Sequence, residues 1–203
     1  FQSQTIQEIM PAQGPVKTHI WGTFTPEREK QAKRVQEYLN YQLLEVMTEY
    51  RSETEKLLFS LPLAGSAFRK IYFDPSLGRP TSMFVPAEDF VVAYNEADLG
   101  QAERYTHVMN RSTNQVKKLQ VSGFYRDVEL TPSHAESNPV TAKYLDIGGV
   151  KPSYDNDERH QLLEMHVDLD LPGFESADEV ALPYVITVDK GNSTILSIYR
   201  NWA

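Results

Sequence analysis

The sequence predicts an α+β fold in which a helical region, a β-hairpin and a C-terminal antiparallel sheet follow one another. Three observations lead to this prediction. A helical pattern runs from Pro26 to about Leu61, two strand-like runs flank a turn at residues 74–80, and the last third contains three strand-like runs. The pattern lacks the interleaved strand and helix order of a parallel sheet, so an α/β fold is not expected.

The composition excludes several classes of protein. The chain of 203 residues has a net charge of -8 at pH 7 and no cysteine, so disulfides and thiolate chemistry are excluded. An acidic chain is poorly suited to tight binding of duplex DNA, because that affinity comes largely from Lys and Arg side chains that neutralise phosphates. No apolar run approaches the roughly 20 residues of a membrane-spanning helix, so we expect no membrane partner.

The first part of the chain is expected to be mostly helical. Residues 1–24 read as an N-terminal arm that contains an edge strand or a short helix. Thr25 is a candidate N-cap, because Pro26 suits the first position of a helix. Apolar residues then recur at helical spacing as far as Tyr50, and a further helical stretch covers residues 52–61. Neither Gly nor Pro separates the two stretches, so the sequence leaves open whether residues 26–61 form one helix or two.

Strands dominate the rest of the chain. A hairpin with strands at residues 66–73 and 81–85 is indicated by Pro75 and Gly78 in the turn between them. A short helix follows at residues 113–121, with Ser112 as its N-cap and Gly123 after its end. The runs at residues 163–171, 182–189 and 194–202 predict an antiparallel sheet of about three strands, with a turn at 190–193.

These elements divide the chain into four parts. The arm covers residues 1–24, and residues 25–128 hold the helices and the hairpin. Residues 129–157, rich in Pro, Ser, Asn and Gly, are expected to be a flexible excursion. Residues 158–203 form the sheet, which we assign to the same domain as residues 25–128.

The run at residues 163–171 alternates apolar and polar side chains. Its apolar residues are Leu163, Met165, Val167, Leu169 and Leu171, and its polar residues are Glu164, His166, Asp168 and Asp170. Alternation predicts that the apolar set faces the core and the polar set faces solvent. The polar set could also hold a divalent ion, which makes a metal-dependent hydrolase an alternative function. Cα atoms two residues apart in a strand are about 6.5–7 Å from each other, so one ion would reach about two of the four side chains.

No other pattern indicates a catalytic, cofactor-binding or metal site. The chain lacks the sequences of phosphate-binding loops, of dinucleotide-binding turns and of nucleophile elbows. Residues 155–158 resemble the start of a calcium loop, but His160 stands where that loop requires Gly. We therefore expect no cofactor, no bound metal and no enzymatic activity.

Several stretches, taken in order, resemble the N-terminal part of the portal proteins of short-tailed bacteriophages. They include PLAGSAFRKIYFDP, VPAEDFVV and GFYRDV, and they lie at residues 32–40, 55–58, 62–75, 85–92, 123–128 and 195–202. Together they cover most of the chain from about Thr25 onward. None of these stretches is a catalytic signature.

The resemblance implies a structural role. Portal proteins form a dodecameric ring at one capsid vertex, through which DNA passes during genome packaging and ejection. The chain would correspond to the wing region, and the stem helices and clip of the family would follow Trp202. The implied partners are other portal subunits, terminase, capsid and tail proteins, and DNA that passes without tight binding. The implied location is the portal vertex of the virion, with assembly in the host cytoplasm.

The sequence leaves one further alternative, an α+β binding module with an unspecified partner. We also expect this chain by itself to be mainly monomeric in dilute solution. That expectation rests partly on the amphipathic helix from Pro26, whose length is about what the core of one domain covers.

Overall fold

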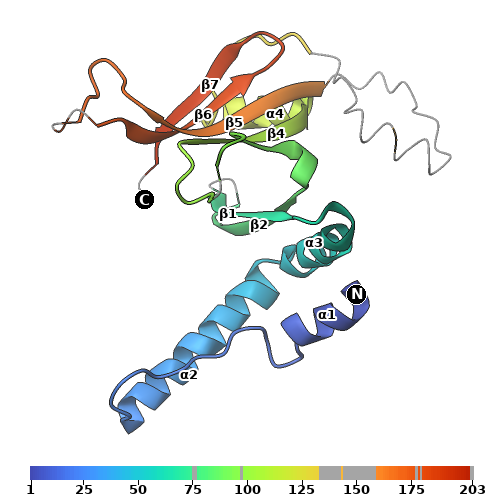
Figure 1. Cartoon of the computed structure of the whole chain (residues 1–203), viewed down its shortest axis with the longest axis vertical. Coiled ribbons are helices and arrows are strands. Elements are labelled where there is room, and N and C mark those ends of the chain that lie inside the picture. Colours follow the sequence, from blue (N-terminus) through green and yellow to red (C-terminus); the bar gives the residue numbers. More distant parts are fainter. Residues whose placement is uncertain are drawn as a thin grey trace. The chain divides into compact units, whose positions relative to one another are not determined.

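The structure is a computed structural model that describes residues 1–74, 77–96, 98–132, 143, 159–176, 178 and 180–201. The chain divides into two compact units, Phe1–Ala87 and Glu88–Ala203. Helices dominate the first unit and strands dominate the second (Figure 1). The predicted α+β fold is confirmed.

Unit 1 contains three α-helices and a hairpin. The helices are α1 (Gln2–Ile9), α2 (Pro26–Tyr41) and α3 (Tyr50–Ala64), and the hairpin strands are β1 (Phe68–Asp74) and β2 (Arg79–Val85). A π-helical turn, η1 (Gln42–Val46), follows α2, and Met47 ends it with φ -89° and ψ 72°. Residues 26–61 therefore form two helices, although neither Gly nor Pro separates them.

The ends of the helices follow the sequence signals. Thr25 caps α2, because its Oγ1 accepts a hydrogen bond from the Arg28 N–H at 3.3 Å. Gly65 ends α3 in the left-handed region with φ 77°. Ile6 and Met10 from the N-terminal arm pack against Leu58 of α3 and form the small buried cluster of this unit.

The five-stranded sheet of unit 2 has the order β3-β4-β5-β6-β7, and all its neighbours are antiparallel. Its strands are β3 (Phe90–Val92), β4 (Arg104–Ser112), β5 (Arg159–Leu169), β6 (Leu182–Asp189) and β7 (Thr194–Arg200). A 3-10 turn, η2 (Ala87–Asp89), precedes β3. The three predicted C-terminal strands are present, and β3 and β4 extend their sheet.

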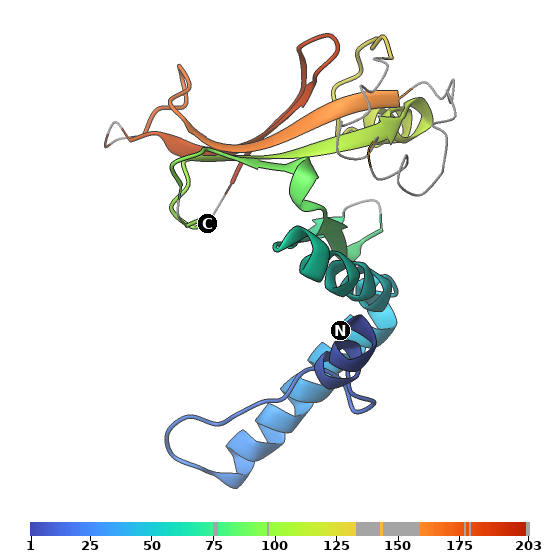
Figure 2. The ribbon, with the colours of Figure 1, turned by 45° about the vertical axis from the view of Figure 1, so that its right-hand side comes forward.

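Helix α4 (Thr113–Val121) packs against β4 and β5, and Figure 2 shows it beside these strands. Ser112 and Gln115 form the capping box at its start. The core of unit 2 lies between this helix and the sheet. Its buried members are Met109, Val116, Tyr125, Leu162 and Leu196.

The compact units differ from the parts of the chain predicted from the sequence. The compact units divide at Ala87 and Glu88, and β3 and β4 belong to the sheet of unit 2. The sequence prediction instead places residues 25–128 and 158–203 in one domain. The flexible excursion predicted at residues 129–157 lies largely outside the described residues, of which only 129–132 and 143 fall in that range. Among the helices that the structure describes, none is both long and apolar enough to cross a membrane.

The core of unit 2 gives a first testable prediction. Leu162 is fully buried among the cluster residues, so Leu162→Ala should lower the free energy of unfolding by about 2–5 kcal/mol through lost burial and a new cavity. Ile198→Ala, at a residue 45% exposed, is the control and should cost less than about 1 kcal/mol. Urea denaturation measures both, and equal losses would contradict this assignment of the core.

Candidate functional site

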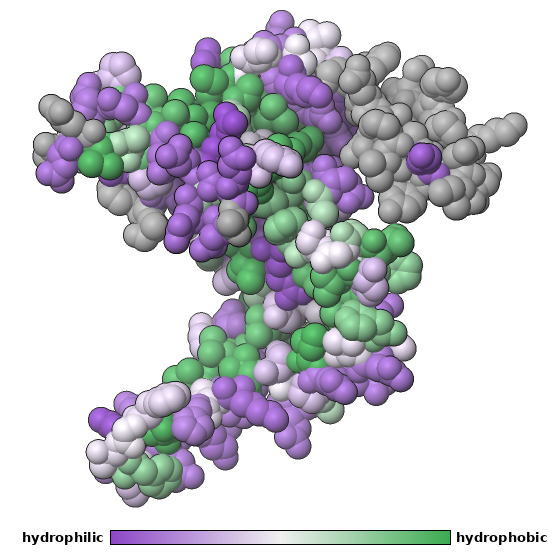
Figure 3. All heavy atoms as spheres, viewed as in Figure 1, coloured by the Kyte–Doolittle hydropathy of each residue, from purple (hydrophilic) through white to green (hydrophobic). Residues whose placement is uncertain are grey.

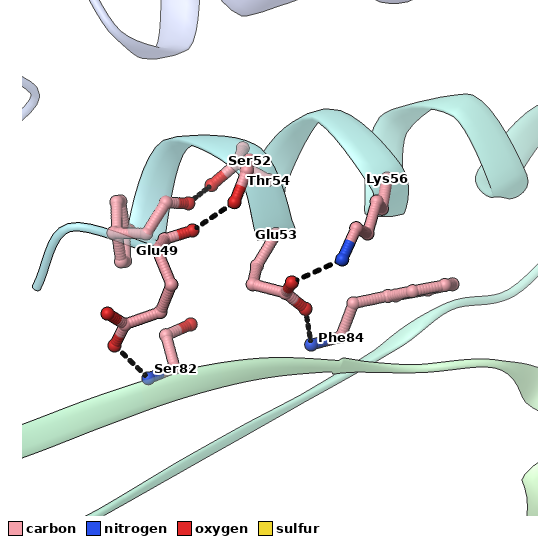
Figure 4. Close-up of polar contacts among 8 residues, drawn as sticks. Glu49, Ser52, Glu53, Thr54, Lys56, Ser82 and Phe84 are labelled. Carbon is pink, nitrogen blue, oxygen red and sulfur yellow. Dashed lines mark hydrogen bonds and ion pairs between the residues drawn. The ribbon is translucent and has the colours of Figure 1, made fainter.

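The outer edge of β2 is capped by two carboxylates from the start of α3. The Ser82 N–H donates to Glu49 Oε1 at 3.2 Å, and the Phe84 N–H donates to Glu53 Oε2 at 2.7 Å. Figure 4 shows both side chains reaching from the helix to the strand. An edge strand has backbone N–H groups without a partner strand, and here two of them find acceptors within unit 1.

These two bonds establish which backbone groups of the hairpin point outward. Ser82 pairs with Ile71 and Phe84 pairs with Arg69. Because their N–H groups leave the ladder, these are the non-hydrogen-bonded pairs, and both partners direct N–H and C=O away from each other. Pro80, opposite Phe73, occupies the same kind of position, so its missing N–H costs the ladder nothing.

Arg79 forms an ion pair with Glu49. We call the contacts of Glu49 and Glu53 with β2, together with this ion pair, the carboxylate clasp. The Nη1 of Arg79 lies 2.8 Å from Glu49 Oε2 and 3.0 Å from Oε1, and both side chains are about four-fifths buried. Burial by itself would raise the pKa of Glu49. Backbone hydrogen bonds, including the one from Ser82, together with Arg79 outweigh burial and hold that pKa below its ordinary value of 4.5. The carboxylate is therefore ionised at neutral pH.

A similar arrangement secures the extended segment before α2. Asn40 accepts from the Val16 N–H at 2.9 Å and donates to the Val16 carbonyl at 3.2 Å. Gln36, one helical turn earlier, accepts from the Thr18 N–H at 3.2 Å. The backbone of Val16 and Thr18 thus faces α2 through side chains spaced four residues apart.

Unit 1 leaves a large part of its apolar surface exposed. None of the 16 residues of α2 is buried, and Val35, Tyr38 and Leu39 are 50%, 61% and 40% exposed. Trp21, before this helix, is 86% exposed. Figure 3 shows hydrophobic residues at the surface of this unit among hydrophilic ones. The expectation that the domain core covers the apolar side of this helix is therefore wrong, and one argument for a monomer is lost.

The four polar residues of the proposed hydrolase site lie in different environments. Glu164 and His166 are largely buried, with side chains 12% and 23% exposed, whereas Asp168 and Asp170 are exposed. Glu164 shares its face of β5 with the fully buried Leu162. The prediction that Glu164 and His166 face solvent is therefore wrong.

The apolar residues of the predicted run at 163–171 are only half-buried. These are Leu163, Met165, Val167, Leu169 and Leu171. The reason is that both faces of the sheet contain buried residues. Ile186 is buried opposite Met165 on one face, and Thr187 is buried opposite Glu164 on the other. A strand with two partly covered faces does not obey the simple alternation rule.

Glu164 is the centre of a polar cluster on the core face. The Nε2 of His166 lies 3.3 Å from Glu164 Oε1, and the His166 ring stacks on Tyr105 at a centroid distance of 4.6 Å. Burial, with the charge of Glu164 as a further cause, raises the pKa of Tyr125 to about 12 and also raises the pKa of Tyr105. These tyrosines stay protonated at neutral pH, so the cluster supplies hydrogen bonds and packing and no phenolate base.

The described residues contain no group of three or more His, Asp or Glu side chains that could hold a metal ion. Glu164 and His166 lie within reach of one ion, whereas Asp168 is exposed. The hydrolase hypothesis therefore lacks the third described ligand that it needs.

Unit 2 also brings together a hydroxyl, an imidazole and a carboxylate, from Thr113, His160 and Asp189, as a catalytic triad does, but their distances do not fit a triad. His160 Nε2 lies 3.3 Å from Thr113 Oγ1, beside a cavity of about 570 Å³ that both residues line. Its Nδ1 lies 3.7 Å from Asp189 Oδ1, which is too long for the hydrogen bond that orients a general base. The other oxygen of Asp189 accepts from the Asn192 N–H at 2.9 Å. This carboxylate therefore holds the β6–β7 turn.

Comparison with known proteins leaves the chain unassigned. No protein-family model matches it, and no curated protein matches its sequence.

Sequence reasoning did not single out Glu49 or Glu53. The chain has several glutamates close together here, among them Glu45 and Glu55, and such a pattern is typical of a solvated helix face. The useful signal is the spacing of four residues, which matches alternate residues of an adjacent strand.

The carboxylate clasp should make unit 1 sensitive to acid. Because the pKa of Glu49 is lowered in the folded state, its contribution to stability is complete above about 4.5 and is lost as the pH falls through the lower, folded-state pKa. Glu49→Gln should therefore lower stability at pH 7 and flatten its dependence on pH below 4.5. Glu45→Gln, at an exposed residue of η1, is the control. Parallel denaturation midpoints of wild type and Glu49→Gln from pH 3 to 7 would contradict the clasp.

The metal hypothesis has a direct test. Wild-type protein titrated with Mg²⁺, Mn²⁺ or Zn²⁺ should keep its Tm, because ions stabilise a fold only through a site that binds them. A concentration-dependent rise in Tm that Glu164→Gln abolishes, and that Asp98→Asn leaves intact, would revive the hydrolase reading. Asp98 lies in a loop of the same unit, where it caps the Gly100 N–H.

Proposed function

We propose that the chain is part of a structural assembly protein, the wing region of a phage portal ring. The ordered stretches that resemble short-tailed phage portal proteins support this function. The helical N-terminal unit followed by an antiparallel sheet is compatible with it. The ring would pass DNA during packaging and ejection and connect the capsid to the tail.

The observation that carries the proposal is the uncovered apolar surface of unit 1. A helix of 16 residues with no buried side chain gains little from packing within its own chain, although most helical stability in proteins comes from such packing. Surfaces with many exposed apolar side chains are typically covered by another protein. A subunit of a ring needs two such surfaces, because each subunit contacts a neighbour on either side.

The net charge of -8 agrees with a body beside which DNA slides without being held, since contacts to phosphates would resist movement. Terminase, capsid and tail proteins are further proposed partners. No observation of the described residues favours the hydrolase or a binding module of another kind over the assembly proposal.

Ring formation by the intact portal protein tests the proposal. Negative-stain electron microscopy of purified protein should show closed rings, and absence of rings and of any larger assembly would refute the proposed function. Within that protein, Val35→Ser with Leu39→Ser should reduce the ring fraction, because the pair removes apolar area from the exposed side of α2. The matched control, Lys33→Ser with Glu37→Ser, removes the exposed ion pair of the opposite side without a change in net charge. Equal loss in both double variants would mean that α2 contributes no specific contact.

A further inference from the structure

We propose that the open edge of β1 receives an extended strand from a second copy of the protein, so that neighbouring subunits share a β-sheet. This inference rests on the proposed function and names one contact through which the ring would form. It starts from a difference between the two edges of the same hairpin.

The backbone groups at the outer edge of β1 are available for pairing with another strand. Arg69, Ile71 and Phe73 pair with Phe84, Ser82 and Pro80 in the non-hydrogen-bonded positions. Their N–H and C=O groups therefore point away from β2. No hydrogen bond joins these three backbone positions to any described residue. On the other side of the hairpin, the matching N–H groups of Ser82 and Phe84 are bound by Glu49 and Glu53.

Two apolar side chains at this edge are exposed to solvent. Ile71 and Phe73 are 63% and 62% exposed. Edge strands of soluble proteins are normally short, charged, bulged or covered, because an exposed flat apolar edge invites pairing with another chain. The seven residues of β1 form a continuous ladder with β2 without a register shift, so the edge is long and regular enough to template a new strand.

The other edges that the structure describes are better protected. At the edge of the five-stranded sheet, the Arg126 N–H donates to the Leu196 carbonyl of β7 at 2.8 Å, and a register shift between Thr187 and Val188 interrupts the β6–β7 ladder. The opposite edge strand, β3, has three residues. The open edge of β1 is therefore the best acceptor of a strand within the described part of the chain.

Charge favours a second copy as the occupant. Residues 68–85 carry three cations, Arg69, Lys70 and Arg79, against one carboxylate, Asp74. Glu49 already neutralises Arg79, so the remaining two cations exceed the carboxylates by one, whereas the whole chain has a net charge of -8. A hairpin that is positive on an otherwise acidic chain is attracted to the acidic remainder of another copy. A contact between the hairpin of one subunit and a different surface of the next is heterologous, which is the kind of contact that closes into a ring.

Amide hydrogen exchange provides the primary test. In assembled rings of the intact protein, the amides of Arg69, Ile71 and Phe73 should exchange at least about tenfold more slowly than in the dissociated subunit, because strand pairing protects them. Unchanged exchange at these three amides in rings would overturn the inference and leave the proposed function standing. Protection that appears only when another virion protein is added would also overturn it, because the occupant would not be a second copy.

Two variants separate the backbone contact from the side chain. Ile71→Pro removes one outward N–H and should abolish ring formation or slow it at least about tenfold, whereas Ile71→Thr keeps that N–H and should assemble nearly as well as wild type. The natural Pro80 occupies an outward position of β2, so the hairpin is expected to tolerate the substitution. Slow exchange at Lys70 and Tyr72, whose backbone groups face β2, verifies that the hairpin has formed. Rings that a correctly folded Ile71→Pro forms at the wild-type rate would overturn the inference, and absence of rings in wild type would instead refute the proposed function.

Discussion

The carboxylates of Glu49 and Glu53 bind the outward N–H groups of β2, the edge strand of a sheet that has two strands in the described part of the chain. These contacts depend on matched spacing. Four residues of α-helix rise about 6 Å, and two residues of strand rise about 6.6–6.8 Å. Side chains one helical turn apart can therefore reach alternate backbone groups of a strand. Gln36 and Asn40 use the same spacing to hold the segment before α2, so both extended segments of this unit are held by helices.

Sequence alone was sufficient for the features that short-range chemistry decides. Thr25 and Ser112 cap their helices as predicted, the hairpin strands begin and end within two residues of the predicted limits, and β6 covers the predicted residues 182–189. Each of these depends on residues a few positions apart. The break between α2 and α3 was not predictable in this way, because a π-helical turn and the conformation of Met47 produce it without Gly or Pro.

The candidate sites were less predictable, because they depend on what covers each face. Alternation along β5 placed Glu164 and His166 in solvent, yet the sheet has buried residues on both faces and Glu164 lies beside the core residue Leu162. Glu164 and His166 are neighbours on one face of β5, but the stacking of His166 on Tyr105 depends on the pairing of β5 with β4, which the sequence does not show. Likewise, nothing in a run of glutamates indicates which of them meets a strand. Glu49 and Glu53 meet the strand because the packing of α3 beside β2 brings them close to it.

The two units differ in what stabilises them, and this difference bears on function. Unit 2 has a core of five buried residues between α4 and the sheet, whereas the buried cluster of unit 1 has three. Side-chain hydrogen bonds and the largely buried ion pair of Arg79 with Glu49 contribute to the rest of unit 1. Each contributes modestly once the cost of desolvation is counted. The small core of unit 1, the exposed apolar side chains of α2 and the open edge of β1 are features that a partner would stabilise. The proposed assembly would bury apolar area that unit 1 leaves exposed, and folding of unit 1 would then be coupled energetically to association of subunits.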